Sequence, residues 1–221
     1  MRYQLVRSKR KTLALALDHQ GALTVRAPLR LPVSQIDVFV DDHWDWVLST
    51  RERIALRPAL PPFALAEGAG IPYLGATLSL HFAATARVRL QGDCLLVPQG
   101  TSSLAPVLRF LDAQAKRVFT ERVAALSAAI LLHPQRIRIS HAKGRWGSMS
   151  GRGTLSLNRA LLHCPPDVVD YVIIHELCHI AHPNHSAAFW AKVENFLPAY
   201  RTQRAWLREH GALITLLPAC P

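Results

Sequence analysis

The chain has 221 residues, half of them hydrophobic, and a formal net charge of +11 at pH 7. This composition predicts a folded globular protein and excludes a disordered one. No apolar run reaches about 18 residues and residues 1–11 lack an apolar segment, so we expect neither a membrane span nor a signal peptide. The four cysteines are scattered without Cys-x-x-Cys pairs, which predicts reduced thiols and a cytoplasmic location.

Residues 1–100 are predicted to form a β-rich N-terminal subdomain that contains one helix. Alternating hydrophobic residues predict a hairpin of two strands over 11–17 and 23–27. An apolar stripe with helical period predicts one continuous helix over 33–56, which the prolines after it end. Three or four further strands, with glycines in their turns, are expected near residues 63–66, 73–82, 87–90 and 94–98.

Residues 101–221 are predicted to form a second, more helical subdomain. It begins with a long helix over about 105–132, whose apolar positions follow the helical period. Two strands at 136–140 and 154–158 then flank a Gly-rich loop at 143–153, and three helices follow at about 165–180, 186–197 and 200–210. This order of elements predicts an α+β fold.

The most informative motif is His175-Glu176-Leu177-Cys178-His179, in the helix predicted over 165–180. Histidines at positions i and i+4 lie on one face of a helix, so both rings can reach one metal ion. Glu176 is placed to take a proton from a water at that ion without being a ligand itself. The rest of the helix is nearly all apolar, so these polar groups are expected to be buried, where a metal would satisfy them. The motif therefore predicts a hydrolytic site with one zinc ion per chain.

A catalytic zinc site needs a third protein ligand and keeps one position open for water. His185 is the favoured candidate, because Pro183 ends the helix and the interval from His179 equals that of the extended zincin pattern. His182 is a rival ligand, since it occupies the midpoint at which that pattern has glycine. Glu194 is a second rival, since one class of zincin uses a glutamate on the following helix. The sequence alone leaves these alternatives open.

Linked motifs extend from the Gly-rich loop to the segment after the metal helix: RWGSMS at 145–150, LSLN at 155–158, YVIIHELCH at 171–179, NHS at 184–186 and FW at 189–190. Together with the N-terminal hairpin and helix, these motifs closely resemble the YgjP-like metallopeptidases, which are minimal zincins related to the SprT-like proteases. The resemblance covers most of the chain, and it implies a minimal zincin-like catalytic part in residues 101–221.

The resemblance also implies a set of site residues. It places zinc on His175, His179 and His185, with Glu176 as the general base. The family usually has cysteine where this chain has Met149. Because three imidazoles suffice for the metal, we expect Met149 to be a packing position on the cleft rim.

The predicted activity is hydrolysis of peptide bonds in a peptide or protein substrate. The segment 136–158 is expected to form the rim of the cleft, along which an extended substrate pairs with an edge strand. Arg145, Trp146 and Ser148 are candidate substrate contacts on this rim, and Tyr200 is a candidate for support of the oxyanion. Packing in the core is the alternative role for Trp146 and Tyr200.

Two other functions fit parts of the sequence. A DNA-associated protease would use the positive charge to bind nucleic acid, as the SprT-like relatives do. It is not favoured, because the sequence shows no zinc ribbon, helix-turn-helix or aromatic-basic stripe, and the densest basic run, at residues 7–11, fits a solvated strand edge or turn better than a binding patch. A non-enzymatic zinc-binding module would keep the metal for stability alone. The sequence does not specify the cleavage site or the oligomeric state.

Overall fold

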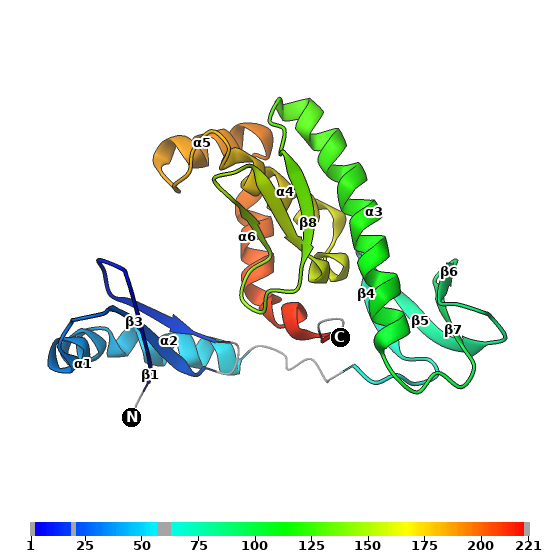
Figure 1. Ribbon diagram of the computed structural model, residues 1–221, viewed down its shortest axis with the longest axis horizontal. Helices are drawn as coiled ribbons and strands as arrows, with labels where there is room; N and C mark the ends of the chain where they lie inside the picture. Colours follow the sequence, from blue (N-terminus) through cyan, green and yellow to red (C-terminus); the bar gives the residue numbers. More distant parts are fainter. Residues whose placement is uncertain (1–2, 19–20, 57–62, 219–221) are drawn as a thin grey trace. The chain divides into compact units, whose positions relative to one another are not determined.

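The computed structural model describes residues 3–18, 21–56 and 63–218, and it confirms an α+β fold (Figure 1). Residues before Ala59 contribute β1 (Gln4–Ser8), β2 (Ala14–Leu17), β3 (Leu23–Pro28), α1 (Val33–Asp42) and α2 (Trp44–Ala55). The rest of the chain contributes β4 (Gly70–Tyr73), β5 (Ala76–Ala83), β6 (Arg89–Gln91), β7 (Cys94–Pro98), α3 (Ala105–Ile130), β8 (Arg136–Ser140), β9 (Gly147–Met149), β10 (Thr154–Asn158), α4 (Pro166–Cys178), α5 (Ala187–Phe196) and α6 (Tyr200–Glu209). Two short 3-10 helices, η1 (Arg159–His163) and η2 (Gly211–Thr215), complete the regular structure of the described residues.

The chain divides between residues 59 and 60 into two compact units, each with its own hydrophobic core. This division differs from the predicted subdomains of 1–100 and 101–221. Strands β4 to β7 belong to the second unit because Ile71, Leu80 and Val97 pack into the same core as the buried faces of α3 and α4. Sequence patterns mark where elements begin and end, but shared core packing decides which elements fold together.

The first unit combines a three-stranded sheet, ordered β1-β3-β2, with helices α1 and α2. The predicted hairpin is present as β2 and β3, and β1 adds a parallel strand that the sequence did not predict. The predicted single helix is divided into α1 and α2 at His43. There the His43 ring nitrogen Nδ1 lies 2.8 Å from the Phe39 carbonyl oxygen, and the His43 backbone N–H donates to the Val40 carbonyl instead. The side chain thus competes for the carbonyl that would continue the helix.

The second unit begins with a four-stranded sheet, ordered β4-β5-β7-β6. The strand predicted at 63–66 is not present, since β4 occupies that edge of β5, with Gly70 opposite Ser79. The strand predicted over 73–82 is interrupted by a tight turn at Leu74 and Gly75, which both have positive φ. Positive φ at both central residues is the requirement of a type I′ hairpin turn, so β4 and β5 pair directly across it.

A second sheet in this unit has the strand order β8-β10-β9, and α4, the helix that contains the His-Glu-x-x-His motif, packs against it. Strand β10 is parallel to β8 and antiparallel to β9, and α4 packs against β9, β10 and the helices α3, α5 and α6. Figure 1 shows α4 in the middle of this unit, with the long helix α3 on one side and α6 on the other. The sequence predicted a loop where β9 lies, because glycines hide its strand pattern.

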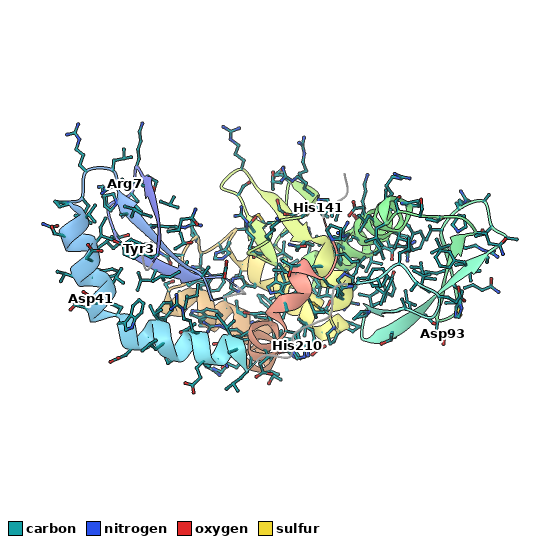
Figure 2. All side chains as sticks on the ribbon, turned by 90° about the horizontal axis from the view of Figure 1, so that it is seen from below. Tyr3, Arg7, Asp41, Asp93, His141 and His210 are labelled. Carbon is teal, nitrogen blue, oxygen red and sulfur yellow. The ribbon has the colours of Figure 1, made fainter. Side chains whose placement is uncertain are left out.

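A buried arginine fixes this sheet to α3. Arg159 is 4% exposed and donates hydrogen bonds to Asp112 at 3.3 Å and to the Pro218 carbonyl. Asp112 also pairs with His141, which is labelled in Figure 2, at 2.8 Å. Because a buried guanidinium is costly unless it is paired, this cluster holds the end of β10 and its following turn in one position.

Within the described ranges, no helix is both long and apolar enough to cross a bilayer.

Candidate metal centre

The sequence of α4 explains where this helix begins and why it is buried. Pro166 occupies the first turn, where a missing N–H costs nothing, and Asp167 lies near the positive end of the helix. Nearly every other side chain of the helix is buried in the core of the second unit. Because packing fixes the helix on several sides, the motif at its C-terminal end is held rigidly.

The structure brings three histidine rings together at the end of α4. His175 and His179 lie one turn apart, with ring centroids 5.1 Å from each other. The chain then reverses, and His185 returns so that its Nε2 lies 3.1 Å from Nε2 of His175. One ligand atom from each of the three residues lies within 4.8 Å of the others.

The two rival ligands do not join this group of described residues. His182 contributes its backbone carbonyl, which lies 3.0 Å from Nδ1 of His179. A proton on this Nδ1 leaves Nε2 of His179 free to coordinate a metal, since a metal-binding histidine donates its other ring N–H. Glu194 pairs with Arg201 at 2.7 Å instead. The assignment of His185 as the third ligand remains a prediction, and the geometry favours it over both rivals.

The donor set fits a zinc ion. Tetrahedral zinc with Zn–N bonds of about 2.0–2.1 Å places its ligand nitrogens roughly 3.3 Å apart, close to the 3.1 Å between His175 and His185. Burial and the nearby His179 lower the pKa of His175 to about 3 and also lower the pKa of His185. Both rings are therefore neutral at pH 7, as coordination requires. Nδ1 of His175 is buried and has no hydrogen-bond partner among the described residues, whereas Nε2 faces His185, so Nε2 is the nitrogen placed to coordinate a metal.

Aromatic side chains of the following helices hold the imidazoles in place. Phe189 stacks on His179 with ring centroids 4.5 Å apart, and Trp190 stacks on His185 at 5.6 Å. Tyr200 lies behind Trp190, at 5.2 Å and nearly parallel to it. Stacking on one face restricts rotation of each imidazole, so the aromatic side chains of α5 and α6 keep the candidate ligands in one orientation.

Glu176 is 7% exposed and lies against strand β9. Burial raises its pKa to about 7, and a hydrogen bond from the Met149 N–H together with the charge of Arg145 opposes this rise. Gly147 passes so close that an added Cβ would lie 2.8 Å from Cγ of Glu176. A carboxyl that titrates near neutral pH and is held by a backbone donor has the properties of a general base.

A cavity of about 900 Å³ contains the three histidines and Glu176. The candidate contacts Arg145 and Ser148 line it. A smaller cavity of about 240 Å³ adjoins it at Glu176, and the candidate Trp146 lines that one. Tyr200 lines neither cavity and is 4% exposed within its aromatic stack. Its role at the oxyanion and the three substrate contacts remain predictions.

Sequence reasoning missed several residues around the site. Gly147 allows the close approach of β9 to Glu176, Tyr171 lines the smaller cavity, and Arg152 lines the larger one. Tyr171 was detectable, since it lies one helical turn before His175 on the same face. Met149 is half-buried and packs against the core, as expected of a rim position, and its backbone also contacts Glu176.

Comparison with known proteins gives a family for this arrangement. The model of the YgjP-like metallopeptidase domain matches residues 11–210. Among solved structures, the metallopeptidase zymogen abylysin of Pyrococcus abyssi has 22% identity and a TM-score of 0.38, over 41% of this chain and 93% of that one. The metallopeptidase zymogen jannalysin of Methanocaldococcus jannaschii has 22% identity and a TM-score of 0.37, over 43% and 96% of the two chains. A search of curated proteins finds no match.

Proposed function

Because the chain belongs to the YgjP-like metallopeptidase family, we propose that it is a zinc-dependent peptidase with one zinc ion per chain. In this proposal His175, His179 and His185 hold the ion, and Glu176 is the general base. The observation that carries the proposal is the convergence of three imidazoles beside a buried glutamate, where all four side chains line one cavity.

Zinc, when bound, supplies a Lewis acid that polarises the scissile carbonyl and makes water acidic enough to be deprotonated near neutral pH. Glu176 accepts the proton of the attacking water at its carboxylate and later donates it to the leaving amine. The Met149 N–H holds this carboxylate in one orientation, and the absence of a side chain at Gly147 leaves room for it. Hydrolysis consumes one water and yields a free carboxylate and a free amine.

Strand β9 is suited to hold an extended substrate. It is the outer strand of its sheet, so one edge of its backbone has no strand partner among the described residues. A peptide added along this edge would gain main-chain hydrogen bonds, and it would lie beside Glu176 because β9 packs against α4. The backbone of Ser148 is directed toward Ser156 of β10, in the same register as Ser150 and Trp146, so the groups on the free edge belong to Gly147 and Met149. The Met149 N–H is bonded to Glu176, so the backbone of Gly147 and the Met149 carbonyl are the expected anchors.

Elemental analysis and turnover together test the proposal. Protein purified without a metal-affinity tag should contain about one zinc per chain and should cleave peptides from a fluorogenic library. Glu176→Gln, which keeps the size of the side chain, should retain the metal and lose hydrolysis by at least about 10²-fold. Absence of a transition metal after zinc is offered would refute the metal assignment. Full turnover by the glutamine variant would remove Glu176 from the mechanism.

A further inference from the structure

We propose that the cleft is selective for acidic peptides, recognised by arginines that form no ion pair with a carboxylate in the part of the chain that the structure describes. The inference rests on the peptidase function proposed above and names the substrate class of that same site. Its basis is the distribution of paired and unpaired charge around the cleft.

Residues 122–166 contain seven lysines and arginines and no aspartate or glutamate. The fold neutralises two of the seven: Arg122 pairs with Asp170, and Arg159 pairs with Asp112. The other five form no ion pair with any carboxylate in the described part of the chain: Arg136, Arg138, Lys143, Arg145 and Arg152. The segment that forms the rim therefore carries an unbalanced positive charge.

Two of these cations lie in the cleft itself. Arg145 and Arg152 are exposed, and both line the cavity that contains the three histidines. Glu176 is the only carboxylate among the described residues that line this cavity. The charge of Arg145 lowers the pKa of Glu176, so this arginine lies within electrostatic reach of the proposed general base. A substrate in the cleft thus meets cations on its rim and, among the described lining residues, no acidic group other than Glu176.

Two more cations lie on β8, in the sheet that also contains β9. Arg136 and Arg138 alternate along β8 and are exposed, whereas Ile137 between them packs against the core. Arg138 lies opposite Ser156 of β10, and Ser156 lies opposite Ser148 of β9. The solvent face of the sheet is therefore polar and cationic from β8 across to the edge strand. An extended peptide beside β9 would present alternate side chains to this face.

The physical consequence is attraction of carboxylates. A cleft lined by one sign of charge focuses the field and raises the association rate of oppositely charged ligands by about 10- to 10³-fold at low salt. Arginine adds geometry, since its planar guanidinium can form two parallel hydrogen bonds with one carboxylate. Nucleic acid is also anionic, but the sheet face described above offers serine and threonine between its arginines and no aromatic ring for base stacking. The chemistry favours an acidic peptide.

The test compares two pools of fluorogenic peptides with the same randomised core, one flanked by glutamates and the other by lysines. We expect kcat/KM for the acidic pool to exceed that for the basic pool by about 10-fold or more at about 0.01 M salt. The ratio should approach unity at about 1 M salt, where the Debye length falls to about 3 Å. Such a salt dependence reports charge rather than side-chain shape.

A matched pair of variants separates the cleft charge from the net charge. Arg152→Glu and Arg109→Glu both lower the net charge by two, from +11 to +9. Arg152 lines the cavity. Arg109 is exposed near the N-terminal end of α3, about 30 Å along the helix axis from the C-terminal end of that helix. We expect Arg152→Glu to lower the acidic-to-basic ratio by about 3- to 10-fold, with no change in zinc content. The ratio for Arg109→Glu should equal that of the unmodified protein.

Each outcome has one meaning. Cleavage of both pools at equal rates, unchanged by Arg152→Glu, overturns the inference and leaves the peptidase function intact. Cleavage of neither pool by zinc-loaded protein overturns the peptidase function, and the inference falls with it. A DNA duplex that competes with peptide, and competes less against Arg152→Glu, would identify nucleic acid as the ligand of these arginines and overturn the peptide assignment. Absence of such competition supports it.

Discussion

Replacement of Gly147 by alanine is the sharpest available test of how the proposed general base is positioned. A Cβ at this position would lie 2.8 Å from Cγ and 2.9 Å from Oε1 of Glu176, and 3.1 Å from Cγ1 of Val172. Non-bonded carbons prefer about 3.5–4.0 Å, so the carboxylate must move by roughly 1 Å. A misplacement of this size in a catalytic site costs about 10²-fold in rate, which is about 2.7 kcal/mol of barrier.

The assay is steady-state hydrolysis of one fluorogenic peptide by zinc-loaded protein. We expect Gly147→Ala to lower kcat by about 10²-fold with little change in KM, because only the proton transfer is disturbed. Zinc content should stay at the level of the unmodified protein, since the three atoms nearest to the new methyl group belong to Glu176 and Val172 and not to a histidine.

Gly144→Ala is the matched control. Gly144 lies in the turn before β9, and a Cβ there would meet no atom of the described residues within 4 Å. Its kcat should therefore equal that of the unmodified protein. If Gly147→Ala kept a kcat within about twofold of this control while binding zinc normally, the close approach of β9 to Glu176 would have no part in catalysis, and the positioning argument would be refuted.

Three further predictions follow from the same structure. His185→Ala should lose zinc at least about 10-fold more readily than His182→Ala or Glu194→Ala, measured by competition with a chromogenic chelator; equal losses would reopen the choice of third ligand. Removal of zinc should lower the free energy of unfolding by about 4 kcal/mol at free zinc near 1,000 times its Kd, and a Tm unchanged by chelation would argue against a bound metal. His163 is buried beside the Pro72 carbonyl, and burial lowers its pKa below 6.5 in the folded state. The unfolded chain therefore binds the proton first, so stability should fall as pH drops below about 6.5, by at most about 1.4 kcal/mol per pH unit from this group. Urea unfolding of His163→Asn should show a shallower decline than the unmodified protein; an identical decline would exclude this histidine as a source of acid sensitivity.

The sequence by itself determined the features that depend on local geometry. The placement of His175, Glu176 and His179 follows from the helical period, because residues one turn apart share a face whatever surrounds them. The start of α4 follows from its paired prolines and the acidic residue after them, and the alternation of β2 and β3 predicted their hairpin. The family resemblance rested on such local motifs, and the match over residues 11–210 agrees with it.

Tertiary structure alone decided features that depend on contacts between distant segments. The sequence left His185, His182 and Glu194 as rivals, and the choice that the geometry favours depends on the chain reversal after α4 and on the pairing of Glu194 with Arg201. The division at residue 59 instead of 100 depends on which side chains share a core, and the break at His43 depends on one side-chain contact.

Two features of the cleft, the strand β9 and the cationic rim, also depend on tertiary structure. A glycine pattern does not indicate that β9 forms a strand or that Gly147 lies against Glu176, because the cause is packing between elements far apart in the chain. The composition revealed an excess of positive charge, but only the fold shows that Asp112 and Asp170 neutralise Arg159 and Arg122. The other cations of the rim form no ion pair with a carboxylate of the described residues. Local periodicity depends on neighbouring residues, whereas strand pairing, charge pairing and burial depend on the whole fold.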